Sequence, residues 1–348
     1  MSTSMATRGG IASFVRSMSA TPLWSTWNIR HVATHRDGSA MAKITRFAYS
    51  VPIFVWRVTV DRPTVVHLHV ASNGSFFRKF TLSLLARSFG VPVVTHVHGG
   101  GFAEFYAESP VVVQRAIRNL LARSSAVITL GATWADRLES IEPKAAIHVI
   151  PNSVRANVAV RQPESGQPVR VLFLGRLEKH KGTFDLIDAW QKMLVEHRSG
   201  PKPVLVIAGD GDVDRVRKFV RDHGLTETVE LPGWIAPEQV PALVRSAQIL
   251  VLPSYYEGQP MSVLEAMANG LCVVTTDVGG IPDLIDGSCG ILLPPGDIDQ
   301  LASALRDVVA DRALRIRLGA AGLARVHEEF DIDVIWRRYD ELYRQVGR

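Results

Sequence analysis

Two acidic side chains stand eight positions apart in the stretch YYEGQPMSVLEA, residues 255–266. Glu257 precedes Pro260, which suits the first turn of a helix because the N–H that proline lacks would be unpaired there. Glu265 lies about a turn and a half into that helix. The free backbone N–H groups at the helix start favour an anion. Carboxylates on both sides of an anion are better placed to accept hydrogen bonds from hydroxyl groups, such as those of a ribose and a sugar.

A second group of residues suits phosphate and follows an apolar run at 169–175. Arg176 comes directly after Gly175, and Lys181 precedes Gly182 and a helical pattern. A diphosphate needs charge-assisted hydrogen bonds and helix-end N–H groups, and this pattern offers both. Two solvated basic side chains would give the same pattern, so the interpretation depends on its combination with the acidic stretch.

A framework of alternating strands and helices must bring these residues together. The apolar, β-branched runs are continuous rather than alternating in polarity, which predicts buried parallel strands. Amphipathic stretches separate the runs, and this repetition predicts an α/β protein with doubly wound parallel sheets, whose ligands bind at the carboxyl ends of the strands. The runs are 64–70, 91–99, 125–131, 146–152, 169–175, 203–211, 228–233, 247–254, 271–280 and 290–296.

Length and charge predict two domains with different partners. The chain of 348 residues is 47% hydrophobic and 21% charged, enough for two cores. We predict domains at 1–155 and 169–330, a linker at 156–168 that is rich in Pro, Gln, Ser and Gly, and a closing helix at 331–348 that packs back on the first domain. Residues 1–155 hold 17 basic and 7 acidic side chains, a net of +10, and the remainder holds 22 and 27, a net of −5.

Cysteine usage and hydropathy predict a cytoplasmic protein. Cys272 and Cys289 have no second cysteine at metal-ligand or framework spacing, which fits a reduced compartment. The N-terminus lacks the apolar segment of a secretory signal, and the longest apolar run, 47–56, is too short to span a bilayer. The basic stretch 75–89 predicts a helix that contacts the anionic inner face of the plasma membrane, or a core-facing helix with a solvated basic edge. Since no recognition motif accompanies the charge, nucleic acid is the poorer explanation.

Four histidines could hold a metal, but the spacing favours packing. His67 and His69, like His96 and His98, are two apart, so each pair shares one face of a strand. Four imidazoles can bind zinc. We predict instead that the pairs lie on neighbouring strands, partly in the core, with the last histidine near the cleft.

Two acidic triplets resemble a metal-binding D-x-D motif. They are DGD at 210–212, which follows a strand pattern, and DID at 297–299, which precedes a helical one. Those contexts predict turn and N-cap acids. No metal site is therefore predicted.

The motifs together resemble a known family. The segments GRLEKHKG, VIAGDGD, VELPGWI and EGQPMSVLE are similar in order and spacing to the C-terminal domain of retaining GT-B glycosyltransferases of family 4, and the last matches the E-x7-E motif of that family. The likeness covers about residues 169–296. The first half is similar more loosely, through RGGI at 8–11, THVHGGGF at 95–102 and IHVIPNSV at 147–154, where Ser153 stands in place of the usual glycine.

The resemblance implies two Rossmann-like domains facing across a cleft, the first for the acceptor and the second for a nucleotide sugar. It implies that Arg176 and Lys181 hold the donor diphosphate, that Glu257 contacts the donor sugar, and that Glu265 binds the ribose. His98 becomes the candidate to contact the transferred sugar. Further donor contacts are implied for Gly9, Gly10, Gly175, Gly258, Gln259, Pro260, Met261 and Ser262.

The implied activity is retaining transfer of a hexose-type sugar from a nucleotide-diphosphate sugar to a hydroxyl of a glycan or polyprenyl-diphosphate-linked acceptor, in bacterial cell-surface or exopolysaccharide synthesis. No metal or other cofactor is implied. The alternatives are a silent donor-binding subunit and a nucleotide-sugar epimerase of the same fold. One departure matters: only MSTSMATR precedes Gly9, so we expect a start that is truncated relative to the family or a first sheet without its central strand.

Overall fold

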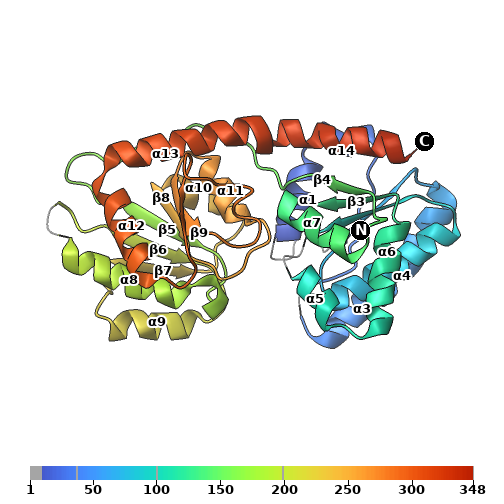
Figure 1. Ribbon diagram of the computed structural model, residues 1–348, viewed down its shortest axis with the longest axis horizontal. Helices are drawn as coiled ribbons and strands as arrows, with labels where there is room; N and C mark the ends of the chain where they lie inside the picture. The colour runs from blue at the N-terminus through green and yellow to red at the C-terminus, as the bar shows by residue number, and fades with distance from the viewer. Residues whose placement is uncertain (1–9, 37, 99–100, 198–199, 348) are drawn as a thin grey trace. The chain divides into compact units, whose positions relative to one another are not determined.

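The chain forms two compact units in a computed structural model that describes residues 10–36, 38–98, 101–197 and 200–347. Unit 1 contains Met1–Ser153 and Ile332–Arg348, and unit 2 contains Val154–Asp331. Each unit is built on its own sheet of parallel strands (Figure 1). Every predicted strand is present within its predicted range, which confirms the α/β class with two doubly wound sheets.

The sheet of unit 1 has the order β1-β2-β3-β4. Its strands are β1 (Val66–Val70), β2 (Val93–Val97), β3 (Ala126–Thr129) and β4 (Ile147–Val149). The helices are α1 (Gly10–Ser19), α2 (Pro22–Thr26), α3 (Ala40–Trp56), α4 (Gly74–Ser88), α5 (Phe102–Glu108), α6 (Val111–Arg123), α7 (Ala132–Ile141) and α14 (Ile332–Val346), with a π-helical turn η1 (Arg57–Asp61) after α3. Gly9 and the other residues before α1 lie outside the described part, and so does the start of the chain, where a truncation or a missing central strand was expected.

Alternating side chains of this sheet pack into two cores. Leu68 and Val127 face a core shared with α3, α4 and α6. Val94 and Ile128 face the opposite core, which α1, α2 and α14 complete. The predicted closing helix is thus α14, and it contributes Tyr339 and further apolar side chains to this second core.

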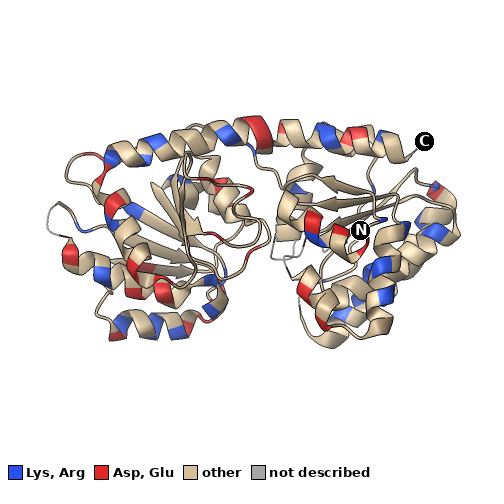
Figure 2. Cartoon of the chain, in the orientation of Figure 1, with Lys and Arg blue, Asp and Glu red and all other residues tan. Residues whose placement is uncertain are grey.

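The basic stretch 75–89 forms α4 as predicted, but its lysine does not face solvent. Lys79 is only 2% exposed, and its ammonium donates a 2.5 Å hydrogen bond to the Thr34 hydroxyl. The position falls on the buried face because it lies three residues after buried Phe76 and three before buried Leu82. The interpretation of Arg78–Lys79 as a solvated basic edge is therefore wrong for Lys79. Other basic side chains do lie along α4 and α6, neither of which contains an acidic residue (Figure 2).

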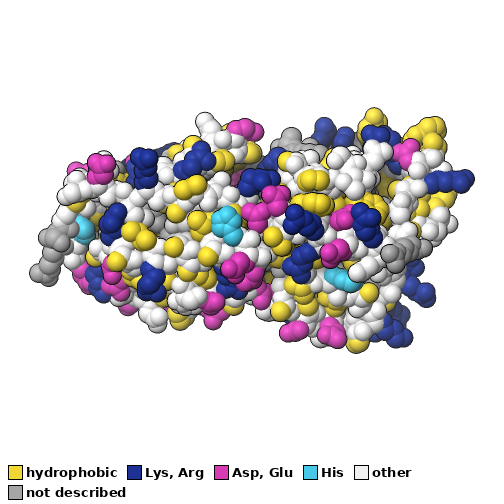
Figure 3. Space-filling view, turned by 90° about the horizontal axis from the view of Figure 1, so that it is seen from above, with side chains coloured by type: hydrophobic (Ala, Val, Ile, Leu, Met, Phe, Trp, Pro, Cys, Tyr) yellow, Lys and Arg dark blue, Asp and Glu magenta, His cyan; other side chains and the backbone are white. Residues whose placement is uncertain are grey.

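The sheet of unit 2 has the order β10-β9-β8-β5-β6-β7. Its strands are β5 (Arg170–Leu174), β6 (Val204–Ala208), β7 (Val229–Gly233), β8 (Ile249–Leu252), β9 (Cys272–Thr276) and β10 (Ile291–Leu293). The helices are α8 (Thr183–Glu196), α9 (Val213–Asp222), α10 (Val240–Arg245), α11 (Met261–Met267), α12 (Ile298–Ala310) and α13 (Arg312–Arg325), with a 3-10 turn η2 (Lys179–Lys181) and a π-helical turn η3 (Val326–Phe330). On the face of unit 2 that carries α13, acidic and basic side chains are interspersed, as is typical of a solvated face (Figure 3).

The segment predicted as a linker, 156–168, contains neither helix nor strand and is fastened to unit 2. The Asn157 and Val160 amides donate to the Ala268 and Asn269 carbonyls at 2.8 and 2.9 Å. Within the described ranges, no helix is long and apolar enough to cross a membrane.

Candidate functional site

The sheet of unit 2 reverses its strand order beside β5. The chain passes from β5 to β6 and β7 on one side, and then returns to β8 on the other side of β5. Ligands of such sheets bind in the crevice at the carboxyl ends of the strands where the order reverses. Gly175 and Arg176 follow β5, and Pro253 and Ser254 follow β8, so the two loops that leave this point carry the predicted site.

The loop after β5 is held by the loop after β6. The Leu177 amide donates to the Asp210 carbonyl at 2.6 Å, and the Asp212 amide donates to the Leu177 carbonyl at 2.9 Å. Gly209 has φ +153°, and a Cβ on it would lie 1.7 Å from the Gly175 carbonyl oxygen. The glycine of the VIAGDGD motif therefore permits the two strand ends to approach each other.

The acidic triplets lie where turn and cap residues were predicted. Asp212 occupies the N-cap of α9, although its side chain makes no capping hydrogen bond. Asp297 occupies the N-cap of α12, and its side chain accepts a hydrogen bond from the Gln300 amide. Asp297 therefore confirms the prediction of an N-cap acid, and DGD lies in the turn between β6 and α9 as predicted.

A second glycine brings Lys181 to the end of β8. Gly182 joins η2 to α8 with φ +67°, and a Cβ there would lie 2.0 Å from the Pro253 carbonyl oxygen. The Tyr255 amide donates to the His180 carbonyl at 2.8 Å and fastens the same two segments. Lys181 is therefore placed by backbone contacts and not by its own flexible side chain.

Lys181 and Glu257 form an ion pair at this point. The ammonium lies 2.6 Å from Oε1 of Glu257, and the Ser254 hydroxyl donates to the same oxygen at 2.7 Å. The Glu257 side chain is 6% exposed and that of Lys181 is 20% exposed. Charge-assisted hydrogen bonds that are largely shielded from solvent are stronger than those of surface pairs. The pairing of the two residues was not predicted, and neither was Ser254, which its place directly after a strand could have indicated.

Arg176 is the more open of the two predicted diphosphate ligands. Its side chain is 62% exposed, and the guanidinium pairs with Glu178. The other carboxylate oxygen of Glu178 lies 3.1 Å from Nδ1 of His180. Arg176 therefore lies at the solvent-facing edge of the loop after β5, where a ligand can reach it.

The E-x7-E stretch enters α11 as expected. Pro260 is the N-cap residue, Met261 begins the helix, and Glu265 is half-buried on it. The helix covers the core through Val263 and its apolar neighbours. Of the other predicted donor contacts in unit 2, Gln259 and Pro260 are buried, and Gly175, Gly258, Met261 and Ser262 are half-buried.

Tyr255 and Asp185 also meet beside the site. The Tyr255 hydroxyl donates to Oδ2 of Asp185 at 2.7 Å, and this hydrogen bond raises the pKa of the phenol. The contact joins the loop after β8 to the first turn of α8. Sequence reasoning missed this pair, because only the folded chain brings the two residues together.

His98, the candidate of unit 1, directly follows β2. Its Nε2 lies 2.7 Å from Nδ1 of His69 on the neighbouring strand. Burial lowers the pKa of His98 to about 3, so its imidazole is neutral at physiological pH. A neutral imidazole can donate and accept hydrogen bonds but cannot serve as a fixed positive charge. Gly10 begins α1, and the position of Gly9 lies outside the described residues.

Comparisons with known proteins agree with this geometry. A family described as "Glycosyl transferases group 1" matches residues 155–325, and a "Glycosyl transferase 4-like domain" matches residues 13–153. The chain is 30% identical over 302 residues to glycogen synthase of Mycobacterium tuberculosis, which covers 82% of this chain and 70% of that protein.

Two solved structures share the fold. Sucrose-phosphate synthase from Thermosynechococcus elongatus superposes with a TM-score of 0.79 at 20% identity, over 97% of this chain and 93% of that one. Anabaena HepE in complex with UDP and glucose superposes with a TM-score of 0.73 at 19% identity, over 99% and 98% of the two chains. The chain therefore has the two-domain GT-B fold and belongs to the group 1 glycosyltransferases, the GT-B enzymes of family 4.

Proposed function

We propose that this glycosyltransferase moves a hexose-type sugar, with retention, from a nucleotide-diphosphate sugar to a hydroxyl of a glycan or lipid-linked acceptor. The observation that carries the proposal is the Lys181–Glu257 pair, with a buried carboxylate and a half-buried ammonium, at the point where the strand order of unit 2 reverses. A cation for phosphate and an acceptor for sugar hydroxyls lie there side by side. Glu265 on α11 is proposed for the ribose hydroxyls.

The role of the protein in the reaction is then electrostatic. As the bond from the sugar to the diphosphate breaks, negative charge develops on the leaving phosphate oxygens. Lys181 is held in place before the reaction and Arg176 lies open to the ligand, so both can stabilise this charge. In this proposal Lys181 and Arg176 supply the positive charge that a divalent metal would otherwise supply, so the transfer is proposed to need no metal.

Retention is proposed to follow from front-face attack. The acceptor hydroxyl approaches from the side on which the nucleotide departs, and its proton passes to a phosphate oxygen of the leaving group. His98 is proposed to orient the transferred sugar through a hydrogen bond from its neutral ring. A neutral ring also avoids placing a positive charge where the sugar develops positive character.

The acceptor is proposed to reach unit 1 at a membrane surface, and α3 supports this proposal more than α4 does. Large apolar side chains of α3 and η1 face solvent, and this apolar face consists of Met41, Ile44, Tyr49, Trp56 and Val60. Lys43 on the same helix is exposed too, and α3 has no acidic residue. Aromatic and aliphatic side chains beside basic ones are typical of surfaces that enter an anionic lipid interface.

The test is transfer and hydrolysis with a panel of UDP-, GDP- and ADP-sugars, with and without EDTA. Transfer with an α-linked product that persists in EDTA supports a retaining, metal-free transferase. Donor binding without turnover would instead indicate a silent subunit, and conversion of one nucleotide sugar into its epimer would indicate an epimerase. Lys181→Ala protein is the matched control for signals that do not arise from the site.

A further inference from the structure

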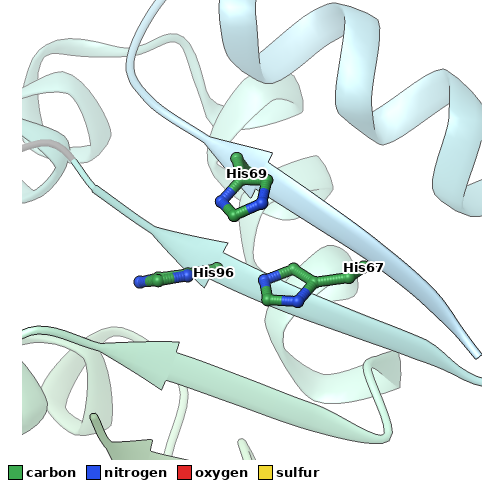
Figure 4. A group of neighbouring side chains, drawn as sticks. All are labelled: His67, His69 and His96. Carbon is green, nitrogen blue, oxygen red and sulfur yellow. The ribbon is translucent and has the colours of Figure 1, made fainter. Parts of the chain in front are cut away.

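Three imidazoles converge inside unit 1, next to His98. His67 and His69 lie on β1 and His96 lies on β2, with His69 and His96 directly paired in the sheet register. We call these three residues the histidine cluster (Figure 4). One nitrogen of each ring lies within 4.8 Å of one nitrogen of each of the others. The cluster faces the core that α1 and α14 cover, where Phe14 packs against His69 and His96.

The central ring of the cluster is costly to bury as it stands. Both nitrogens of His96 are buried and have no hydrogen-bond partner among the described residues. A buried polar atom without a partner costs about 1–3 kcal/mol, and native proteins contain few of them. A leucine would fill the same space without this cost. The unsatisfied ring therefore points to a ligand that the protein binds there.

The other two rings are held in the manner of metal ligands. Nδ1 of His67 lies 2.5 Å from the Tyr343 hydroxyl, and Nδ1 of His69 lies 2.7 Å from Nε2 of His98. Metal-binding histidines usually engage the second ring nitrogen in this way, which fixes the tautomer and the ring orientation. Metal on either ring would accordingly be bound through Nε2.

We propose that His67, His69 and His96 bind a divalent transition metal, for which Zn²⁺ is the best match. Imidazole nitrogens suit zinc, whereas magnesium and calcium require oxygen ligands. Zinc–nitrogen bonds of about 2.0–2.1 Å separate neighbouring tetrahedral ligands by roughly 3.4 Å. The rings of His67 and His69 are stacked 4.4 Å apart, so they must rotate about their side-chain bonds to close the site. The fourth position takes water, and its ionisation to hydroxide offsets part of the charge.

The hydrogen bonds of the second ring nitrogens decide which nitrogen of each ring can face the metal. With Nε2 of His69 on the metal, Nδ1 keeps its proton and donates it in the hydrogen bond to His98. The site joins β1, β2 and, through Tyr343, α14, so the metal is structural and the transfer step stays metal-free in this scheme.

Zinc titration of the full-length protein tests the proposal. Protein dialysed against a chelator is titrated with Zn²⁺ in competition with a chromophoric zinc indicator, and its melting temperature is recorded. We expect one tightly bound zinc per chain and a rise of about 5 °C when zinc exceeds its Kd about 100-fold. X-ray absorption of the loaded protein should show nitrogen ligands at about 2.0–2.1 Å with imidazole scattering behind them.

Two variants separate this site from surface binding. His96→Leu removes both unsatisfied nitrogens, so the zinc-free variant should melt no lower than zinc-free wild type, yet bind zinc on the order of 100-fold more weakly. His327→Ala removes an exposed histidine beside Glu328 and should leave the zinc site intact. Equal zinc binding by wild type and His96→Leu overturns the proposal. If His96→Leu does not fold, the X-ray absorption spectrum of the zinc-loaded wild type decides. A spectrum without imidazole scattering around the zinc overturns the proposal.

Discussion

The Lys181 ammonium lies 2.6 Å from a Glu257 carboxylate oxygen, although 76 positions separate the two residues in the sequence. Glu257 holds the Lys181 ammonium at the point where the strand order reverses. A donor diphosphate that arrives there can share the ammonium, and its sugar hydroxyls can bind the carboxylate. The two side chains are therefore already in place for the diphosphate and the sugar of the proposed donor before the donor binds.

Loss of Lys181 should affect the chemical step more than donor binding. We expect Lys181→Ala to lower kcat by a factor on the order of 10² or more, because it removes a preorganised cation from the leaving phosphate. Glu257→Gln should also lower kcat, and the double variant should lose less than the product of the two single losses, since the residues act as a unit. Steady-state kinetics with a nucleotide-sugar donor measures these effects.

Lys192 provides the matched control, because it forms an exposed pair with Asp299 from the same unit. Lys192→Ala should leave kcat and KM unchanged. A Lys181→Ala enzyme with normal kcat and only a raised KM would contradict the proposed role. Lys181 would then bind the donor equally well in the ground state and in the transition state, and would not accelerate the reaction.

The close approach at Gly182 should make an alanine there costly. Gly182→Ala introduces a side chain at φ +67° and a Cβ 2.0 Å from the Pro253 carbonyl oxygen. Gly224→Ala places the same side chain at φ +68° with nothing within 4 Å, so it measures the backbone cost alone. We expect about 1 kcal/mol of destabilisation at Gly224 and at least about 2 kcal/mol more at Gly182. Equal melting temperatures for the two variants would contradict the close contact.

The strands were predictable from the sequence because the apolar runs are continuous and are separated by helical patterns. The ends of these runs also predicted that Lys181 and Glu257 lie in loops that follow strands. Their direct contact was not predictable, because it depends on the order of strands β5 and β8 in the sheet. The spacing of Lys79 to Phe76 and Leu82 indicates its burial, whereas the basic character of the stretch indicates exposure. The convergence of His67 and His96 requires the register of β1 against β2, which no local pattern contains.

The apolar face of α3 should determine membrane association. Trp56 is 61% exposed, and Trp56→Ser should weaken binding to anionic vesicles roughly 10-fold, since burial of a large apolar side chain contributes about 1.5–3 kcal/mol. Val195→Ser changes an apolar side chain of α8 that is even more exposed, at 79%, and should have no effect. Cosedimentation with anionic and with neutral vesicles at low salt gives the comparison. If wild type and Trp56→Ser bind anionic vesicles equally well, the apolar face of α3 does not contribute to membrane binding.

Lys79 should lower the stability of the protein at neutral pH. Burial lowers its pKa from 10.5 to about 7 in the folded protein. Between pH 7 and about 10.5 the unfolded chain therefore binds more protons than the folded one, so the free energy of unfolding rises with pH across this window. Below pH 7 both states are protonated, and the contribution of Lys79 no longer changes. Lys79→Met should remove this dependence and stabilise the protein at pH 7 by up to about 4 kcal/mol, since each pKa unit corresponds to about 1.4 kcal/mol.

Urea unfolding at pH 7, 8, 9 and 10 measures the effect as the difference between Lys79→Met and wild type. Lys43→Met is the control, because Lys43 is exposed on α3 and its removal should give the same small difference at every pH. The Lys79→Met difference should be largest at pH 7 and should shrink towards pH 10, as the wild-type lysine loses its proton in both states. A difference that stays constant with pH would mean that the ammonium is solvated in the folded protein, and the placement of Lys79 against Thr34 would then be wrong.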